Sequence, residues 1–228
     1  MRNFAFCALL LCGLASGVLA AQQGPKIDRP TEPNFVFDDD GGKVQIVPAD
    51  FSAGGPKTFH GGPVLASARQ VSIFLGAGWG DQQVRSRQTS LLNVTGDAKD
   101  SDLTELRSHN IRVNASAARV EDFSDLSAAA INDLAIQQKL SDLLQSKTVP
   151  APAPGTVYVV FLAPGIVSTV GGSKAGVDYA AYHNFVNLEA GEVHYVVVPF
   201  HQDTRQHAAA TTRAFAETAL NPNGQGWF

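Results

Sequence analysis

The stretch TVYVVFLAP, residues 156–164, carries the strongest structural signal in this chain. It is a dense run of β-branched and aromatic residues, which is typical of a strand buried near the centre of a sheet. A second run of the same kind, EVHYVVVPF at 192–200, predicts another buried strand. The fold is therefore expected to be built around these two strands.

Four further segments complete the predicted order of elements. An apolar run from Val71 to Leu75, closed by glycines, predicts a strand, and residues 81–96 follow as a helix. Residues 132–144, NDLAIQQKLSDLL, place their leucines and isoleucine on one stripe and predict an amphipathic helix. HAAATTRAFAETAL at 207–220 predicts a closing helix, ended by Asn-Pro-Asn-Gly. The order strand, helix, helix, strand, strand, helix indicates a single layered α/β domain, a mixed sheet with packed helices.

Three segments have weaker patterns. Residues 21–58 mix proline, glycine and charge with few apolar side chains, so we expect a mobile leader, although KVQIVP at 43–48 suits a short strand. Residues 97–123 fit either a strand or a loop, and 165–185 read as a glycine-rich loop. The acidic cluster at 38–40 lacks the later ligands of a calcium loop and is interpreted as a turn.

The first 20 residues have the pattern of a secretory signal peptide. Arg2 precedes an apolar run, and small residues at Val18 and Ala20 fit cleavage before Ala21. A membrane anchor is the alternative, but the apolar stretch is short for a stable membrane span. With the signal peptide and the expected leader set aside, the domain is expected to occupy residues 59–228. The signal peptide predicts that it is secreted or periplasmic.

Composition excludes several functional classes. Both cysteines, Cys7 and Cys12, lie in the predicted signal, so the mature chain has no disulfides, cysteine nucleophile or cysteine-ligated zinc. Loss of Arg2 takes the formal net charge from −4 to −5, and the chain has no long block of like charge. Nucleic acid and anionic membranes are therefore not expected as partners.

Arg213 and Glu217 stand four residues apart on the closing helix, the spacing at which metallohydrolases carry two metal ligands. A zinc hydrolase needs about three neutral or anionic ligands and a carboxylate that takes a proton from bound water. Arg213 is permanently cationic and repels a metal. We therefore expect the two side chains to pair with each other.

Several segments together resemble the phosphate-induced protein family, also called EXORDIUM-like. The resemblance is carried by the order and spacing of six segments: FHGGPVL, IQQKLSDLL, PAPGTVYVVFLAPG, AYHNF, HYVVVPF, and the closing helix with NP…GWF. It runs from about Phe59 to the end of the chain. The resemblance implies a secreted domain whose closing helix is similar to that of zinc peptidases.

The closing helix departs from the family pattern Ser-His-Glu-x-x-Glu-x-x-x-Asp-Pro. Arg213 stands in the place of the histidine, Ala214 in that of the first glutamate and Asn221 in that of the aspartate, whereas Glu217 and Pro222 are retained. The cysteines that relatives carry near their Tyr-His pair are absent. The resemblance thus implies a zincin-like helix that has lost its catalytic residues.

Outside this helix, His183 beside Tyr182 matches the Tyr-His pair of the family and is the histidine that we place nearest a cleft. The sequence has no Gly-x-Ser-x-Gly elbow for a serine nucleophile, and GGSKAG at 171–176 lacks the ending of a phosphate-binding loop. The candidate binding residues are therefore Tyr182, His183, Arg213 and Glu217, with no catalytic residue, no metal and no cofactor.

The sequence leads to one functional expectation and two alternatives. The first is a secreted, non-catalytic binding or structural protein with an extracellular or periplasmic ligand. The second is an active metallohydrolase that uses Glu217, His183 and another histidine. The third is an interaction module with no catalytic ancestry.

Overall fold

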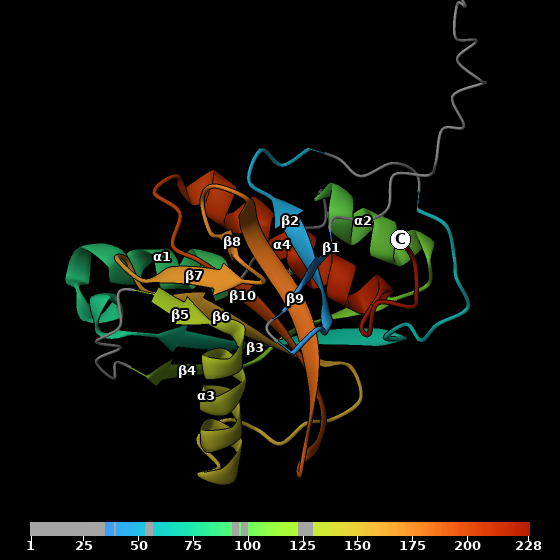
Figure 1. Cartoon of the computed structure of the whole chain (residues 1–228). Helices are drawn as coiled ribbons and strands as arrows, with labels where there is room; N and C mark the ends of the chain where they lie inside the picture. The colour runs from blue at the N-terminus through green and yellow to red at the C-terminus, as the bar shows by residue number, and fades with distance from the viewer. Residues whose placement is uncertain (1–34, 39, 53–56, 93–95, 97–99, 123–129) are drawn as a thin grey trace, which may run out of the picture.

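The computed structural model describes residues 35–38, 40–52, 57–92, 96, 100–122 and 130–228. The predicted signal peptide and residues 21–34 lie outside this part of the chain. The described residues form a single α/β domain with a mixed sheet, as predicted, and with four α-helices packed on it (Figure 1).

Seven strands form the main sheet in the order β1-β2-β9-β10-β6-β3-β4. β6 lies between β3 and β10 and is parallel to both, while β9 runs antiparallel to β10 and to β2. The strands span Phe35–Phe37 (β1), Lys43–Pro48 (β2), Ser67–Leu75 (β3), Arg112–Asp122 (β4), Thr156–Leu162 (β6), Tyr179–Leu188 (β9) and Gly191–Val198 (β10).

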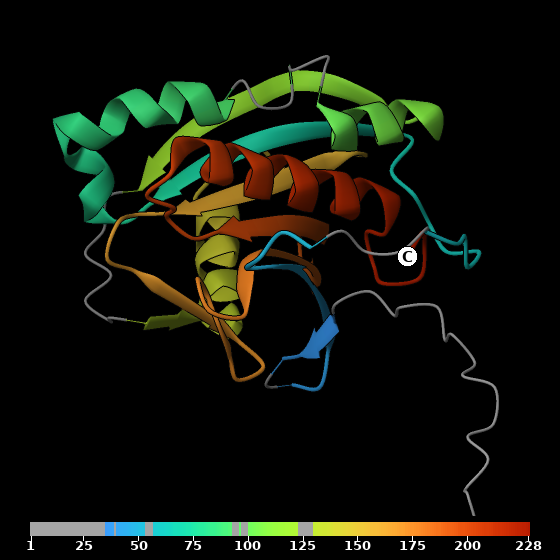
Figure 2. The ribbon, with the colours of Figure 1, turned by 90° about the horizontal axis from the view of Figure 1, so that it is seen from above.

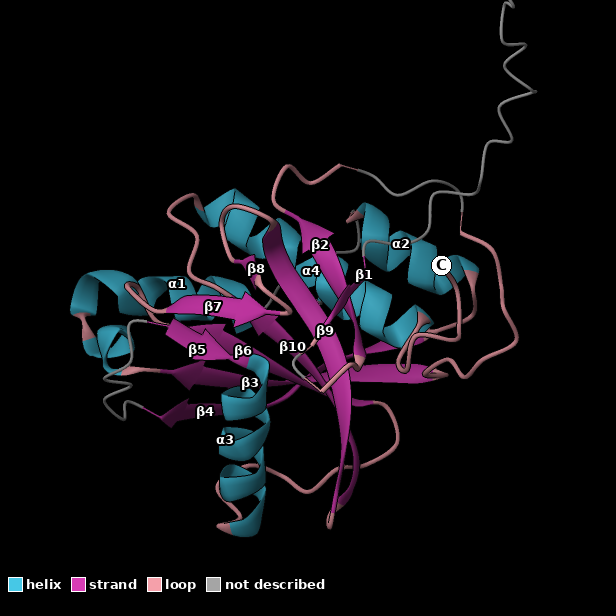
Figure 3. Cartoon of the chain, viewed as in Figure 1, coloured by secondary structure: helices cyan, strands magenta, loops and turns pink. Residues whose placement is uncertain are grey.

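The helices cover both faces of this sheet (Figures 2 and 3). One face, here called the α4 face, carries the helices α1 (Gln82–Leu92), α2 (Ser101–Ser108) and α4 (Thr204–Leu220). The other, the α3 face, carries α3 (Asp133–Gln145) and a small sheet of β5 (Ala130–Asn132), β7 (Val167–Val170) and β8 (Ser173–Lys174). A short 3₁₀ helix, Ala77–Gly80, follows β3.

β6 explains why this sheet needs two covers. All seven of its residues are buried, and successive side chains point to opposite faces. Val157, Val159 and Phe161 join the core of the α4 face, whereas Tyr158 and Val160 join that of the α3 face. The unbroken apolar run in the sequence is thus the consequence of burial on both sides.

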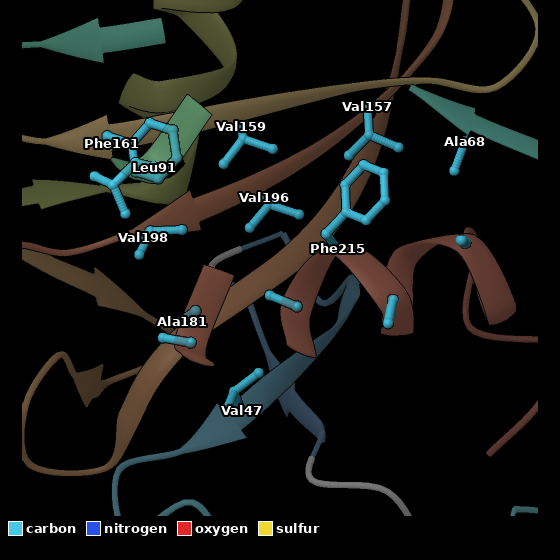
Figure 4. Packing of buried hydrophobic residues seen from close by; sticks show 14 of the residues in the cluster. Val47, Ala68, Leu91, Val157, Val159, Phe161, Ala181, Val196, Val198 and Phe215 are labelled. Atoms are coloured by element: carbon cyan, nitrogen blue, oxygen red, sulfur yellow. The ribbon is translucent and has the colours of Figure 1, made fainter. Parts of the chain in front are cut away.

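The core of the α4 face forms around a helix of small residues. The alanines of α4 let its backbone approach the sheet, and Phe215 projects toward Val157 of β6 (Figure 4). Val196 and Val198 of β10 complete the packing beside it. Burial of a side chain such as Phe215 contributes about 2–3 kcal/mol.

The α3 face is fixed by a buried carboxylate. Asp133, in the first turn of α3, accepts hydrogen bonds from the hydroxyl of Tyr195 (2.8 Å), Nδ2 of Asn184 (3.0 Å) and Nε2 of Gln137 (2.8 Å). Asn132 caps the helix by accepting from the backbone N–H of Ala135. These bonds attach the amino end of α3 to β9 and β10.

The prediction of a mobile leader over residues 21–58 is wrong for its described second half. β2 pairs with β9 along the main sheet, and Val44 and Val47 are fully buried. Asp38 and Asp40 lie between β1 and β2, where the Asp38 carboxylate accepts from the backbone N–H of Asp40 (3.1 Å). KVQIVP indicated the strand itself, but local composition did not show that it joins the main sheet, because its partner strand β9 lies more than 130 residues further along the chain.

The loop predicted over 165–185 is likewise corrected. It contains β7, β8 and the first part of β9. β7 pairs with β8, whereas β9 pairs with both β2 and β10. The undecided segment 97–123 provides α2 and the edge strand β4. In the described part of the chain, no helix is long and apolar enough to cross a membrane.

The packing of β1 can be tested at a pair of neighbouring glycines. Gly171 has φ +54°, and a Cβ there would lie 1.7 Å from the carbonyl oxygen of Phe37, whereas Gly172 has φ +80° and no heavy atom within 4 Å of its Cβ position. We expect Gly171→Ala to lower the free energy of unfolding by about 3 kcal/mol and Gly172→Ala by about 1 kcal/mol. Urea denaturation measures both, and equal losses would contradict the docking of β1.

Candidate functional site

The candidate site lies on α4, which follows β10 directly and packs along β9 and β10. Asp203 caps its amino end by accepting from the backbone N–H groups of Arg205 (2.7 Å) and Gln206 (3.1 Å). Asn221 ends it, and Pro222 then prevents continuation. The carboxyl-terminal half of the helix therefore holds its side chains in fixed positions against the sheet.

Arg213 and Glu217 form the ion pair that their spacing predicted. Nε of Arg213 lies 3.2 Å from Oε1 of Glu217. The two terminal nitrogens of the guanidinium donate to the backbone carbonyls of Phe51 (3.1 Å) and Ser52 (2.9 Å), just beyond β2. The side chains are only 16% and 7% exposed, so this is a buried clamp between α4 and the amino-terminal segment.

Glu217 is an unusual carboxyl group because burial dominates its charge state. Burial raises its pKa to about 7, although the neighbouring charges of Arg213 and Lys57 act in the opposite direction. Its second oxygen, Oε2, has no hydrogen-bond partner among the described residues. The group thus changes protonation near neutral pH inside a nearly closed environment.

His183 lies on the α4 face of the sheet, between β9 and α4. Its Nε2 lies 3.0 Å from Oε1 of Gln45 in β2, and the same oxygen accepts from Nδ2 of Asn221 at 2.8 Å. Because an amide oxygen only accepts, Nε2 carries the proton. Burial lowers the pKa of His183 to about 3, so the ring is neutral at ordinary pH.

Tyr182 does not belong to this site. Successive side chains of a strand point to opposite faces, so Tyr182 lies in the core of the α3 face, where its ring packs edge-on against Tyr179. The Tyr-His pair of the sequence is divided by the sheet. The structure brings Arg213 and Glu217 together, whereas His183 lies on the same face of the sheet and is bonded to Gln45 instead.

Sequence reasoning missed Gln45 and the two carbonyls that bind Arg213, because all three lie in the segment predicted to be a leader. Only KVQIVP signalled that this segment had structure.

The other histidines are spread over the molecule. His201 and His207 lie near the amino end of α4 with ring centroids 5.5 Å apart. His194 pairs with Glu192 at 3.1 Å on β10. His60 stacks on Phe228, and His109 packs against Trp227 with its ring tilted. Within the described ranges, no three histidine, cysteine, aspartate or glutamate side chains converge to hold a metal ion.

Comparison with known proteins adds no relative. No protein-family model matches this chain, and no curated protein matches it in a sequence search. The interpretation of the site therefore depends on its geometry and on the resemblance of its segments.

Replacing Arg213 should leave a buried carboxylate without its counter-ion. The pKa of Glu217 is raised from 4.5 to about 7 in the folded chain, so the stability that its protonated form contributes is lost as the pH rises through this range. We expect Arg213→Ala to cost about 3 kcal/mol at pH 8 and less at pH 5, where Glu217 is protonated and only the bonds to the two carbonyls are lost. Urea denaturation at both pH values measures the difference.

The control for this prediction is the double variant Arg213→Ala/Glu217→Gln. It removes the stranded charge and should recover part of the loss at pH 8. A loss below about 0.5 kcal/mol for Arg213→Ala at pH 8 would show that the pair behaves as an exposed one.

A second test concerns His207, which is fully buried among Trp79, Phe161 and Phe200. Burial lowers its pKa to about 3. Below pH 6.5 the unfolded chain therefore binds a proton that the folded chain does not, and stability falls with decreasing pH. Between pH 6 and 4, His207→Phe should remove about 1.4 kcal/mol per pH unit of that fall. The exposed His60→Phe is the control, and the same slope in both variants would refute the assignment.

Proposed function

We propose that this protein is a secreted, non-catalytic binding or structural domain of the phosphate-induced, EXORDIUM-like type, with a closing helix similar to that of zinc peptidases. One observation carries the proposal. The guanidinium of Arg213 occupies the position on α4 where a metal ligand would be required, and each of its three nitrogens donates a hydrogen bond, to Glu217 and to the carbonyls of Phe51 and Ser52.

The polar side chains of the α4 face support a non-catalytic role. Ala214 has no group that takes a proton from water, and the protonated nitrogen of His183 is directed at Gln45. Glu217 is the one carboxylate of the helix, and it is bound by a permanent cation. An active metallohydrolase would need His183 and Glu217 to release these partners and to share an ion with a third ligand.

The same face supports a structural role for the retained polar residues. Asn221 donates to Gln45 and accepts from the backbone N–H of Gly226 (2.6 Å). A side chain that would have served chemistry in a relative here ties the end of α4 to β2 and to the last residues of the chain. The third alternative, an interaction module with no catalytic ancestry, would have the same hydrogen bonds. It differs from the proposed function only in its evolutionary origin.

Metal analysis separates the proposal from the metallohydrolase alternative. Protein purified without chelator and without a metal affinity tag should hold no stoichiometric zinc by elemental analysis. A variant that removes the candidate ligand, Glu217→Gln, is the matched control and should give the same background. About one zinc per chain in the wild type, lost in the variant, would overturn the proposal.

Export is tested by the mass of the exported protein. The small residues at Val18 and Ala20 predict cleavage by signal peptidase after Ala20. Intact mass spectrometry should therefore give a mature chain that begins at Ala21. Recovery of an exported form that retains residues 1–20 would contradict the assignment.

A further inference from the structure

A cavity of about 430 Å³ lies at the opposite end of the sheet from His207, where β3, β6 and β10 begin. Three segments line it: residues 64–67 before and at the start of β3, residues 152–155 before β6, and residues 190–192 with His194 at the start of β10. Its volume falls within the usual range for small-molecule sites. None of the residues used in the proposed function lines it.

The walls of this cavity combine apolar and polar surface and are held in place. Val64, Leu65, Pro152 and Pro154 are the larger apolar side chains that line it. The proline segment is fixed at both ends, since the hydroxyl of Tyr158 donates to the carbonyl of Pro150 (2.6 Å) and the backbone N–H of Arg69 donates to that of Gly155 (2.8 Å). A site whose walls are already ordered loses little entropy when a ligand binds.

Gly155 shows how closely this segment packs. It has φ +78°, and a Cβ there would lie 1.8 Å from the carbonyl oxygen of Ser67. Only glycine fits at this contact, which sets the width of the cavity between the proline segment and β3.

One charged side chain lines the cavity, and it is acidic. Glu192 is the one charged side chain among the lining residues; it is 46% exposed and lies 3.1 Å from Nε2 of His194. Burial lowers the pKa of His194, so the imidazole is neutral at ordinary pH and does not cancel the charge of Glu192. The neutral ring instead orients the carboxylate at the mouth of the cavity.

We propose that this cavity binds a small primary amine, with the ammonium group on the carboxylate of Glu192 and a short apolar body against Val64, Pro152 and Pro154. A carboxylate beside rigid apolar walls is complementary to a cation that carries an alkyl chain, and it repels a carboxylate of the same shape. The proposal depends neither on the ancestry of α4 nor on export.

The ammonium can come from a free amine or from the side chain of a lysine. Both present the same group on a similar alkyl chain, and they differ in the backbone attached to it. The experiment therefore includes N-acetyl-lysine methylamide as one ligand. Saturable binding of hexylamine together with this compound would assign the site to exposed lysines as well, and binding of hexylamine without it would assign the site to free amines.

The test is a two-dimensional ¹⁵N NMR titration of the full mature chain at pH 7.5 with hexylamine, hexanol and hexanoate. The three ligands share one alkyl chain and differ in the charge of the end group. Hexylamine should shift the amide signals of residues 64–67, 153, 155 and 190–194 and should bind roughly tenfold more tightly than hexanol. Hexanoate should bind more weakly than either.

Variants on one hairpin give the decisive comparison. Glu192→Gln should reduce the affinity for hexylamine to that for hexanol, whereas Glu189→Gln, an exposed residue outside the cavity, should leave it unchanged. Ala153→Phe should weaken both hexylamine and hexanol by filling the cavity. Thermal unfolding of each variant confirms that it is folded.

Two results would overturn the proposal. One is equal binding of hexylamine and hexanoate, or shifts scattered away from the three segments. The other is an equal effect of Glu189→Gln and Glu192→Gln, which would indicate general attraction to a negatively charged protein. Neither result bears on the zinc content of α4, so this proposal and the proposed function fail separately.

Discussion

The buried carboxylate of Glu217 sets the constraint on which much of this structure depends. A carboxylate between a helix and a sheet needs a counter-ion, and Arg213 one turn earlier provides it. The guanidinium then has further donors to satisfy, and it finds them in the carbonyls of Phe51 and Ser52. Those carbonyls are in reach only because β2 is paired with β9. A local pair on one helix thus holds an amino-terminal segment more than 160 residues away in the chain.

The hydrogen bonds among polar side chains on the α4 face bear on the proposed function. Gln45, His183 and Asn221 form a chain of hydrogen bonds in which each polar side chain is directed at another part of the fold. The nitrogen of His183 that donates to Gln45 is engaged within the fold, and Glu217 is bound to the permanent cation Arg213. Residue types that often indicate chemistry here join the helix α4 to the antiparallel strands β9 and β2.

The two ends of the parallel strands differ in a way that bears on ligand binding. Ligands of open α/β sheets usually bind at the carboxyl ends of the strands. Here Trp79, which donates to the carbonyl of Phe161 (2.9 Å), fills that end together with Phe200 and His207, and Arg87 covers it by donating to the carbonyl of Gln202 (3.0 Å). The cavity lies instead at the amino ends, where proline and glycine segments leave space between the strands.

The sequence by itself determined the central strands β6 and β10 and the helices α3 and α4. Their signals are local: an unbroken apolar run, an apolar stripe with a cap, and the spacing of Arg213 and Glu217 were enough. Only the tertiary structure decided that residues 43–48 join the main sheet, that β9 emerges from a glycine-rich segment, and that Tyr182 and His183 face opposite sides. Strand pairing depends on partners far along the chain, and the face of a side chain depends on register, in which a shift of one residue reverses every position. The site was therefore predictable where it lies on one helix, and not where β2 and β9 complete it.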